Sequence, residues 1–225
     1  MNSNVRHIGI IIDGNRRYAK KLLLQPWKGH DMGAERVENI IEWTSDLGIK
    51  ILTIYALSTE NLKREAKELE HLFGLFRKWF TKIRSDKRVK ERQIKFKFIG
   101  RLELLPEDLN KLCREIEKDT ENNKGMLVNF CMAYGGRQEL IEAMKKIVES
   151  KQEITEENLR KNLWLQEEPE LIIRTGNRTR TSNFLPWQSA YSEWIFLEKL
   201  WPEFTKQDLI ECLEKFSKMD RNFGR

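Results

Sequence analysis

The chain has 225 residues, of which 40% are hydrophobic and 34% charged, so it can bury a core and is not a disordered segment. Its formal net charge of +6 suits nucleic acid, an anionic membrane surface or phosphorylated small substrates, and composition does not choose among them. The sequence shows no apolar run of about 18 residues, no signal-peptide pattern and no paired cysteine spacing. We therefore expect a single cytoplasmic domain over residues 1–225.

Short apolar runs alternate with longer amphipathic stretches, a pattern typical of an α/β fold with a mainly parallel sheet. In chain order, strands are expected at 7–12, 51–56, 94–99, 127–133, 171–174 and 194–197. Helices are expected at 34–47, 67–91, 106–122, 137–150, 155–163 and 206–218. Ligands bind outside the carboxyl ends of the strands in open parallel sheets, so the loops after the strands are where a site is expected.

The loop after the first strand reads Asp13-Gly14-Asn15-Arg16-Arg17. Gly14 and Asn15 can adopt positive φ, which turns backbone N–H groups toward an oxyanion, and the two arginines supply forked donors for a diphosphate. Asp13 would then hold a divalent cation against that diphosphate. Taken alone, the same residues are also typical of a plain turn with solvated arginines.

A second basic segment follows the fifth expected strand, with Arg174, Arg178 and Arg180 within seven residues and Ser182 two positions further on. An anion would relieve the repulsion among these arginines, although a solvated basic loop has the same composition. Two separate candidate anion sites support each other. No GxxxxGK[ST], GxGxxG, HExxH or GxSxG motif is present, which argues against ATP hydrolysis, dinucleotide binding, zinc proteolysis and α/β-hydrolase chemistry.

Two further segments leave alternatives open. Ser58-Thr59-Glu60-Asn61 follows the second expected strand, with Arg64 three residues beyond. This group can orient a substrate or move a proton, but a serine at this spacing is also a helix cap. His30 is either a phosphate donor or an ordinary loop histidine.

Six segments taken together resemble the cis-prenyltransferase family, which includes the undecaprenyl and dehydrodolichyl diphosphate synthases. They are HIGIIIDGNRRYAKK, GHDMGAE, LTIYALSTENLKR, NFCMAYGGRQEL, IIRTGNRTRTSNFLPWQSAYSE and WPEF. They cover nearly the whole chain, and DGNRRYA is similar to the archaeal and eukaryotic form of its motif. The resemblance implies a six-stranded, mainly parallel sheet flanked by helices, an apolar tunnel and a homodimer.

The resemblance also implies a reaction. An allylic prenyl diphosphate would be condensed with isopentenyl diphosphate, with Mg²⁺, to give a medium- or long-chain cis-polyprenyl diphosphate. A peripheral membrane contact would suit this lipid product, and nucleic acid is not an expected partner. The alternatives are irregular, branched coupling and a non-catalytic partner subunit, although the latter usually lacks the metal aspartate and the arginines found here.

The family's functional residues carry over onto matching positions of this sequence. By resemblance, Asp13 is the catalytic and metal-binding aspartate, and Glu193 completes the Mg²⁺ site, often across the dimer. Residues matching the primer-diphosphate site are Gly14, Asn15, Arg16, Arg17 and His30, with Tyr18 beside them. Residues matching the isopentenyl diphosphate site are Arg174, Arg180 and Ser182, with Thr181 beside them. Asn61 matches the residue that helps remove the proton, with Ser58, Thr59, Glu60 and Arg64 nearby.

The expected helix 67–91 carries an apolar stripe of helical period that would line the tunnel or pack in the core. Its members are Leu69, Leu72, Phe73, Phe76, Trp79, Phe80 and Ile83. Three positions depart from the family pattern. Pro26 stands where a basic residue is common, Leu62 stands where a tryptophan is common, and the ending RNFGR replaces Arg-x-Phe-Gly-Gly.

Overall fold

The computed structural model describes residues 5–219, so the RNFGR ending lies outside the described residues. Six strands form one sheet in the order β3-β4-β2-β1-β5-β6, and each neighbouring pair is parallel. The strands are β1 His7–Ile11, β2 Ile51–Tyr55, β3 Lys95–Ile99, β4 Leu127–Cys131, β5 Leu171–Arg174 and β6 Glu193–Phe196. The expected single-domain α/β fold is confirmed, and its sheet is parallel throughout.

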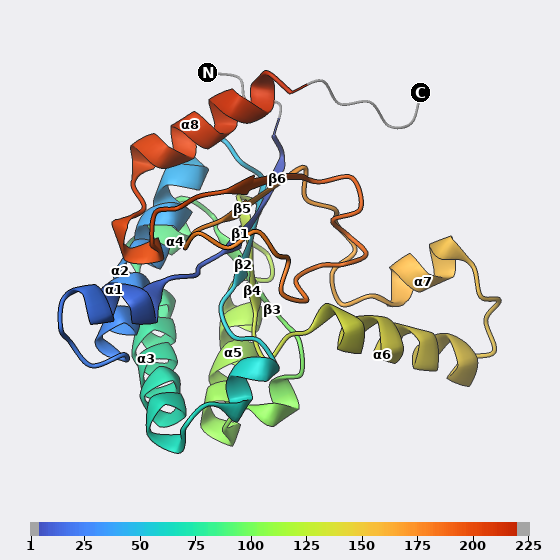
Figure 1. Cartoon of the computed structure of the whole chain (residues 1–225). Coiled ribbons are helices and arrows are strands. Elements are labelled where there is room, and N and C mark those ends of the chain that lie inside the picture. The colour runs from blue at the N-terminus through green and yellow to red at the C-terminus, as the bar shows by residue number, and fades with distance from the viewer. Residues whose placement is uncertain (1–4, 220–225) are drawn as a thin grey trace.

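Helices cover the sheet because its central strands are apolar on both faces. All five residues of β1 and of β2 are buried, as parallel strands between two helical layers require. The helices are α1 Asn15–Lys21, α2 Lys28–Asp46, α3 Ala66–Ser85, α4 Lys87–Glu91, α5 Glu107–Asp119, α6 Gly136–Glu149, α7 Glu156–Asn162 and α8 Lys206–Ser217. Short 3₁₀ turns lie at Glu60–Lys63, Leu102–Leu104 and Trp201–Glu203. Figure 1 shows α2, α3 and α5 along the sheet, while α6 and α7 project from the body.

The prediction of one helix over 67–91 was wrong, because the chain breaks at Asp86. Asp86 has extended backbone angles, with φ −72° and ψ 116°, and its carboxylate accepts the backbone N–H of Arg88 at 2.9 Å. This is the N-cap of a new short helix, α4. The apolar period continues across the break, which is why the pattern alone did not show it.

Residues 15–33 are more helical than the sequence predicted. Gly14 has φ +115° as expected, but Asn15 begins α1 and is not among the positive-φ residues. Helix α2 begins at Lys28, six residues before the predicted start, so His30 lies in its first turn and not in a loop. A Cβ on Gly29 would lie 1.9 Å from the backbone oxygen of Asn15. Only glycine permits this close approach of α1 and α2.

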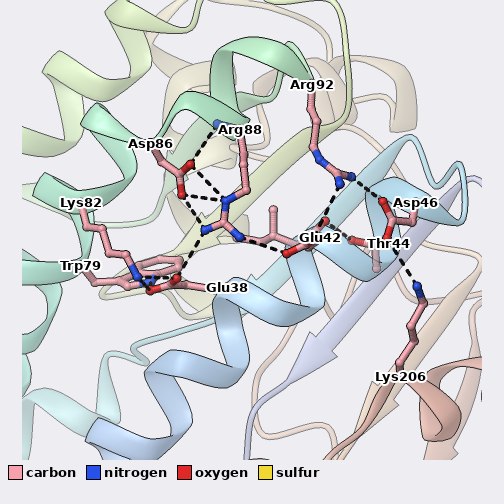
Figure 2. A network of polar contacts seen from close by, with 11 residues as sticks. Glu38, Glu42, Thr44, Asp46, Trp79, Lys82, Asp86, Arg88, Arg92 and Lys206 are labelled. Carbon is pink, nitrogen blue, oxygen red and sulfur yellow. Dashed lines mark hydrogen bonds and ion pairs between the residues drawn. The ribbon is translucent and has the colours of Figure 1, made fainter.

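An ion-pair network joins α2 to the end of α3, to α4 and to α8 at the end of the molecule away from β1's carboxyl end (Figure 2). Arg88 Nη1 donates to Glu42 Oε2 at 3.0 Å, and Arg92 Nη1 donates to Asp46 Oδ1 at 2.6 Å. Beside them, Trp79 Nε1 donates to Glu38 Oε1 at 3.1 Å. Within residues 5–219, no helix is both long and apolar enough to cross a membrane.

Candidate active site

A cavity of about 760 Å³ opens at the carboxyl ends of β1, β2 and β5 and continues between α2 and α3. Polar side chains line one part of its wall, among them Asp13, His30, Ser58, Asn61, Arg64, Arg174 and Ser182. Apolar side chains line another part, among them Val37, Ile54, Leu72, Leu75, Phe76, Trp79 and Phe130. One cavity thus combines a charged region with a lipophilic one.

Asp13 lies between two arginines that come from distant parts of the sequence. Arg17 Nη2 donates to Asp13 Oδ1 at 3.0 Å, and Arg174 Nη2 donates to Asp13 Oδ2 at 2.8 Å. Arg174 is only 3% exposed, and its Nη1 also donates to Ser182 Oγ at 2.7 Å. A buried guanidinium in this position needs an anion, which Asp13 supplies. The two basic segments of the sequence therefore meet on one carboxylate.

The backbone of Gly176 permits this arrangement. Gly176 has φ +88°, and a Cβ there would lie 2.6 Å from Arg17 Nη2. Its carbonyl oxygen accepts a hydrogen bond from Arg17 Nη1. Thr175 Oγ1 donates to the backbone oxygen of Asp13 at 2.7 Å, which ties the two loops together. A side chain at position 176 would push Arg17 out of the site.

A second charged cluster is centred on Glu68, a buried residue of α3 that sequence reasoning missed. Arg64 Nη1 donates to Glu68 Oε1 at 2.8 Å, and His30 Nε2 lies 3.3 Å from the same oxygen. Burial, helped by Arg64, lowers the pKa of His30 from 6.5 to about 4. His30 is therefore neutral at pH 7, and it can offer a hydrogen bond without bringing a charge. The four-residue spacing of Arg64 and Glu68 was the signal that could have revealed this pair.

Ser58 and Asn61 hold each other. The hydroxyl of Ser58 accepts the backbone N–H of Asn61 at 3.1 Å, and Asn61 Oδ1 accepts the N–H of Ser58 at 3.2 Å. Ser58 lies just before Thr59, the N-cap residue of the short turn Glu60–Lys63, and its hydroxyl binds an N–H inside that turn; Ser58 and Asn61 also line the cavity. The capping and the site interpretations of this segment are compatible.

A family model described as "Putative undecaprenyl diphosphate synthase" matches residues 11–224. The chain belongs to the undecaprenyl diphosphate synthase family. A tritrans,polycis-undecaprenyl-diphosphate synthase (geranylgeranyl-diphosphate specific) of Methanopyrus kandleri is 44% identical, over 97% of this chain and 84% of that protein. An isoprenyl transferase of Thermus thermophilus is 39% identical, over 98% of this chain and 89% of that protein. Lavandulyl diphosphate synthase from Lavandula x intermedia, solved in complex with dimethylallyl diphosphate, has a TM-score of 0.92 at 32% identity, and each chain covers 100% of the other.

The cavity of this family member gathers most of the residues expected from the resemblance, though not all of them. Those that line it are Asp13, Asn15, His30, Ser58, Glu60, Asn61, Arg64, Arg174, Thr181 and Ser182. Those that do not line it are Gly14, Arg16, Arg17, Tyr18, Thr59 and Arg180. Lining residues that sequence reasoning did not assign include Leu75, Gln138, Asn183 and Pro186. Their side chains reach the cavity through tertiary packing that no short motif records.

Glu193 does not lie with Asp13 in this chain. It is the first residue of β6 and pairs with Leu171 of β5, which is level with Ile8 of β1, whereas Asp13 lies two residues beyond Ile11, the last residue of β1. At about 3.3 Å per residue, a strand separates the two carboxylates by roughly 10 Å or more. A shared metal site would need Glu193 from another copy of the chain.

The apolar stripe of α3 divides between the cavity and the core. Leu72, Phe76 and Trp79 line the cavity. Phe80 is fully buried, and its ring packs against Phe98 with centroids 4.9 Å apart. The two interpretations offered for the stripe, tunnel wall and core packing, each describe some of its members.

Proposed function

We propose that the chain condenses isopentenyl diphosphate with an allylic prenyl diphosphate to give a cis-polyprenyl diphosphate. One observation carries the proposal: the cavity joins an arginine-rich region at the strand ends to an apolar region between α2 and α3. A substrate with a diphosphate head and a hydrocarbon tail matches both regions at once. The relatives' names support the same activity.

The charges and contacts of the site residues suggest a role for each in the reaction. Arg174 holds diphosphate oxygens in the proposed mechanism, and its buried Nε has no hydrogen-bond partner among the described residues. Donors fixed in this way stabilise the negative charge that develops as the primer's diphosphate leaves. The double bond of isopentenyl diphosphate then attacks the allylic carbon, and loss of a proton forms the new double bond. Asn61, held by Ser58, is assigned to orient the group that takes this proton.

We propose that Asp13 binds Mg²⁺ together with the substrate. Among residues 5–219, no group of three or more His, Cys, Asp or Glu could hold a metal by itself. Mg²⁺ fits a single carboxylate well, because in proteins it keeps several waters and takes its other oxygens from substrate phosphates. The ion would neutralise charge on the leaving diphosphate. A diphosphate would in turn compete with Asp13 for Arg17 and Arg174.

We also propose a homodimer. Helix α6 presents Ile141, Met144 and Val148 at 52%, 50% and 66% exposure, along one face at spacings of three and four residues. Phe196 of β6 is also exposed, at 36%. Helices α6 and α7 project from the body, where a second copy could cover them (Figure 1). A dimer would also explain how Glu193 could reach the metal site of another copy.

The proposal also extends to which allylic diphosphate serves as the primer. The Methanopyrus kandleri relative is described as geranylgeranyl-diphosphate specific, and we propose the same primer for this chain. The test is mass spectrometry of products formed from isopentenyl diphosphate with dimethylallyl, farnesyl or geranylgeranyl diphosphate, with and without EDTA. We expect a series that grows by single C5 units from geranylgeranyl diphosphate and stops with EDTA. A branched product of two C5 units, or no product with any primer, would overturn the proposal.

A further inference from the structure

The connection between α1 and α2 carries three exposed leucines within a basic segment. Leu22, Leu23 and Leu24 are 44%, 95% and 42% exposed. Residues 18–30 contain three lysines and no acidic residue: Lys20, Lys21 and Lys28. We call residues 22–26 the leucine loop. Exposed apolar residues beside basic ones form a combination that the active site does not use.

Nothing in the fold explains leucine at position 23. Leu23 has φ +56°, a conformation that asparagine and glycine adopt far more readily than leucine. Leu185 has a similar φ of +48°, but it is fully buried, so packing accounts for its side chain. Leu23 has neither a favourable backbone angle nor a buried side chain. A role outside the monomer's core would account for it.

The leucine loop is held in place. The backbone N–H of Leu23 donates to Lys20 O at 3.0 Å, and that of Leu24 donates to Ala19 O at 2.9 Å, which closes the end of α1. After the loop, the ring of Trp27 lies 6.4 Å from that of His71 on α3. The leucines are thus presented at a fixed place beside α2 and α3, at the edge of the molecule (Figure 1).

We propose that the leucine loop docks the protein on an anionic lipid bilayer. The leucines enter the interface between headgroups and acyl chains, and Lys20, Lys21 and Lys28 meet the lipid phosphates. Lys21 pairs with Glu203 at 2.7 Å and Lys28 with Asp31 at 3.4 Å. Both lysines are more than half exposed, so each can also face a lipid phosphate.

Docking would bring a second hollow close to the bilayer. A groove of about 610 Å³ lies between α2 and α3 and includes His71, the residue beside Trp27. Ala34, Leu75 and Trp79 line both this groove and the active-site cavity, so they form the wall between the two. A polyprenyl chain could pass this wall toward the membrane. That release route depends on the proposed function, whereas docking itself does not.

The test is flotation of the full chain with vesicles of phosphatidylcholine containing about a third phosphatidylglycerol. Leu23→Asn removes the most exposed leucine and suits the positive φ, so the variant should fold at least as well. We expect it to lower the vesicle partition coefficient at least tenfold, and Lys20→Gln to lower it about fivefold at low salt. Leu104→Asn, a matched loss of an exposed leucine in the turn Leu102–Leu104, should leave partition unchanged. Turnover of short, soluble substrates should be unchanged in Leu23→Asn.

Several results would overturn the docking proposal. They are absence of wild-type binding to anionic vesicles, an equal loss of binding in Leu104→Asn, and unchanged vesicle binding in a folded Leu23→Asn. If Leu23→Asn instead altered the oligomeric state and not vesicle binding, the loop would be an interface between copies. A chain that binds vesicles through Leu23 but makes no polyprenyl product would contradict the proposed function and leave docking intact.

Discussion

Charged side chains gather in two regions of this molecule, and the same groups behave differently in each. At the strand ends, Arg174 and Asp13 pair with side chains that are 4% and 29% exposed. At the other end of the α2–α3 pair, Arg88 and Glu42 form an ion pair of similar length with side chains that are 45% and 39% exposed. The two regions differ in how deeply their charged side chains are buried, and not in the length of their ion pairs.

This difference sets what each region can do. Taking charges out of water costs free energy that their attraction seldom exceeds, so a buried pair is poor evidence of stabilisation and leaves groups poised for an incoming ion. An exposed network is screened by water and salt, and each pair contributes little. The buried region is therefore suited to chemistry, and the exposed one to a modest hold between helices (Figure 2).

The largest effect is expected from removing the charge of Asp13. Asp13→Asn keeps the side chain's shape but removes the proposed Mg²⁺ ligand and the anion that balances Arg17 and Arg174. We expect kcat/KM to fall at least a thousandfold, which corresponds to about 4 kcal/mol of transition-state stabilisation. Steady-state kinetics with radiolabelled isopentenyl diphosphate would measure it.

The control for this variant is Asp108→Asn, which removes an exposed carboxylate paired with Arg77. Its kcat/KM should stay within about twofold of wild type, with circular dichroism showing both variants folded. If Asp13→Asn kept near-normal turnover that EDTA did not abolish, Asp13 would not be a metal ligand, and the buried region would be structural.

Much of this contrast could be read from the sequence, and the remainder depended on tertiary packing. The strands were predicted because their runs of Ile, Leu and Val are buried on both faces, and their order along the chain brought the two basic segments to one edge. The break at Asp86 was missed because the apolar period continues through it. Glu68 was missed because its partner His30 is 38 residues away, and only the α2–α3 contact joins them.

The next prediction compares residues of α3 that line the cavity with residues of α3 that pack in the core. Phe80→Ala should destabilise the fold by about 3–5 kcal/mol, because its fully buried ring leaves a void. Phe76→Ala and Trp79→Ala remove rings that line the cavity, so they should shift products toward longer chains. Phe73 is half-buried against the core and does not line the cavity, so Phe73→Ala should leave product length unchanged.

Products would be sized by reversed-phase chromatography after phosphatase treatment, and stability would be measured by urea unfolding. An unchanged product distribution in active, folded Phe76→Ala and Trp79→Ala would place the length limit elsewhere. A longer product from Phe73→Ala would show that the cavity wall extends further along α3 than the structure indicates.

A smaller effect is expected from pH, through His30. Burial and then Arg64 lower its pKa from 6.5 to about 4, so the unfolded chain binds a proton more readily than the folded one. The free energy of unfolding should therefore fall as pH drops from about 6.5 to about 4, with about 3 kcal/mol from this residue. His7 has a pKa of about 4 from burial and should contribute over the same range.

Variants of the two histidines test whether His30 causes this pH dependence of the free energy of unfolding. In urea unfolding at several pH values, His30→Gln should reduce the pH dependence of stability and leave the His7 contribution in place. His30→Gln could instead keep the full wild-type pH dependence of stability while His7→Gln removed it. In that case the pKa of His30 would be the same in the folded and unfolded chain, because the Glu68 carboxylate would offset the effect of burial.

The smallest effect is expected in the exposed network, from Arg92→Gln. Arg92 Nη1 donates to Asp46 Oδ1 at 2.6 Å, yet the two side chains are 30% and 37% exposed, so water already competes with the pair. We expect the free energy of unfolding to fall by about 0.5 kcal/mol at low salt. This loss should disappear near 1 M NaCl, because a Debye length of about 3 Å screens exposed charges there.

Turnover and product length should not change in Arg92→Gln. Glu38→Gln is the informative partner variant, because Glu38 also accepts the N–H of Trp79 at the cavity wall. A loss above about 2 kcal/mol for Arg92→Gln, undiminished by salt, would mean that the network acts as a cooperative clamp on α2, and the contrast between the two regions would fail.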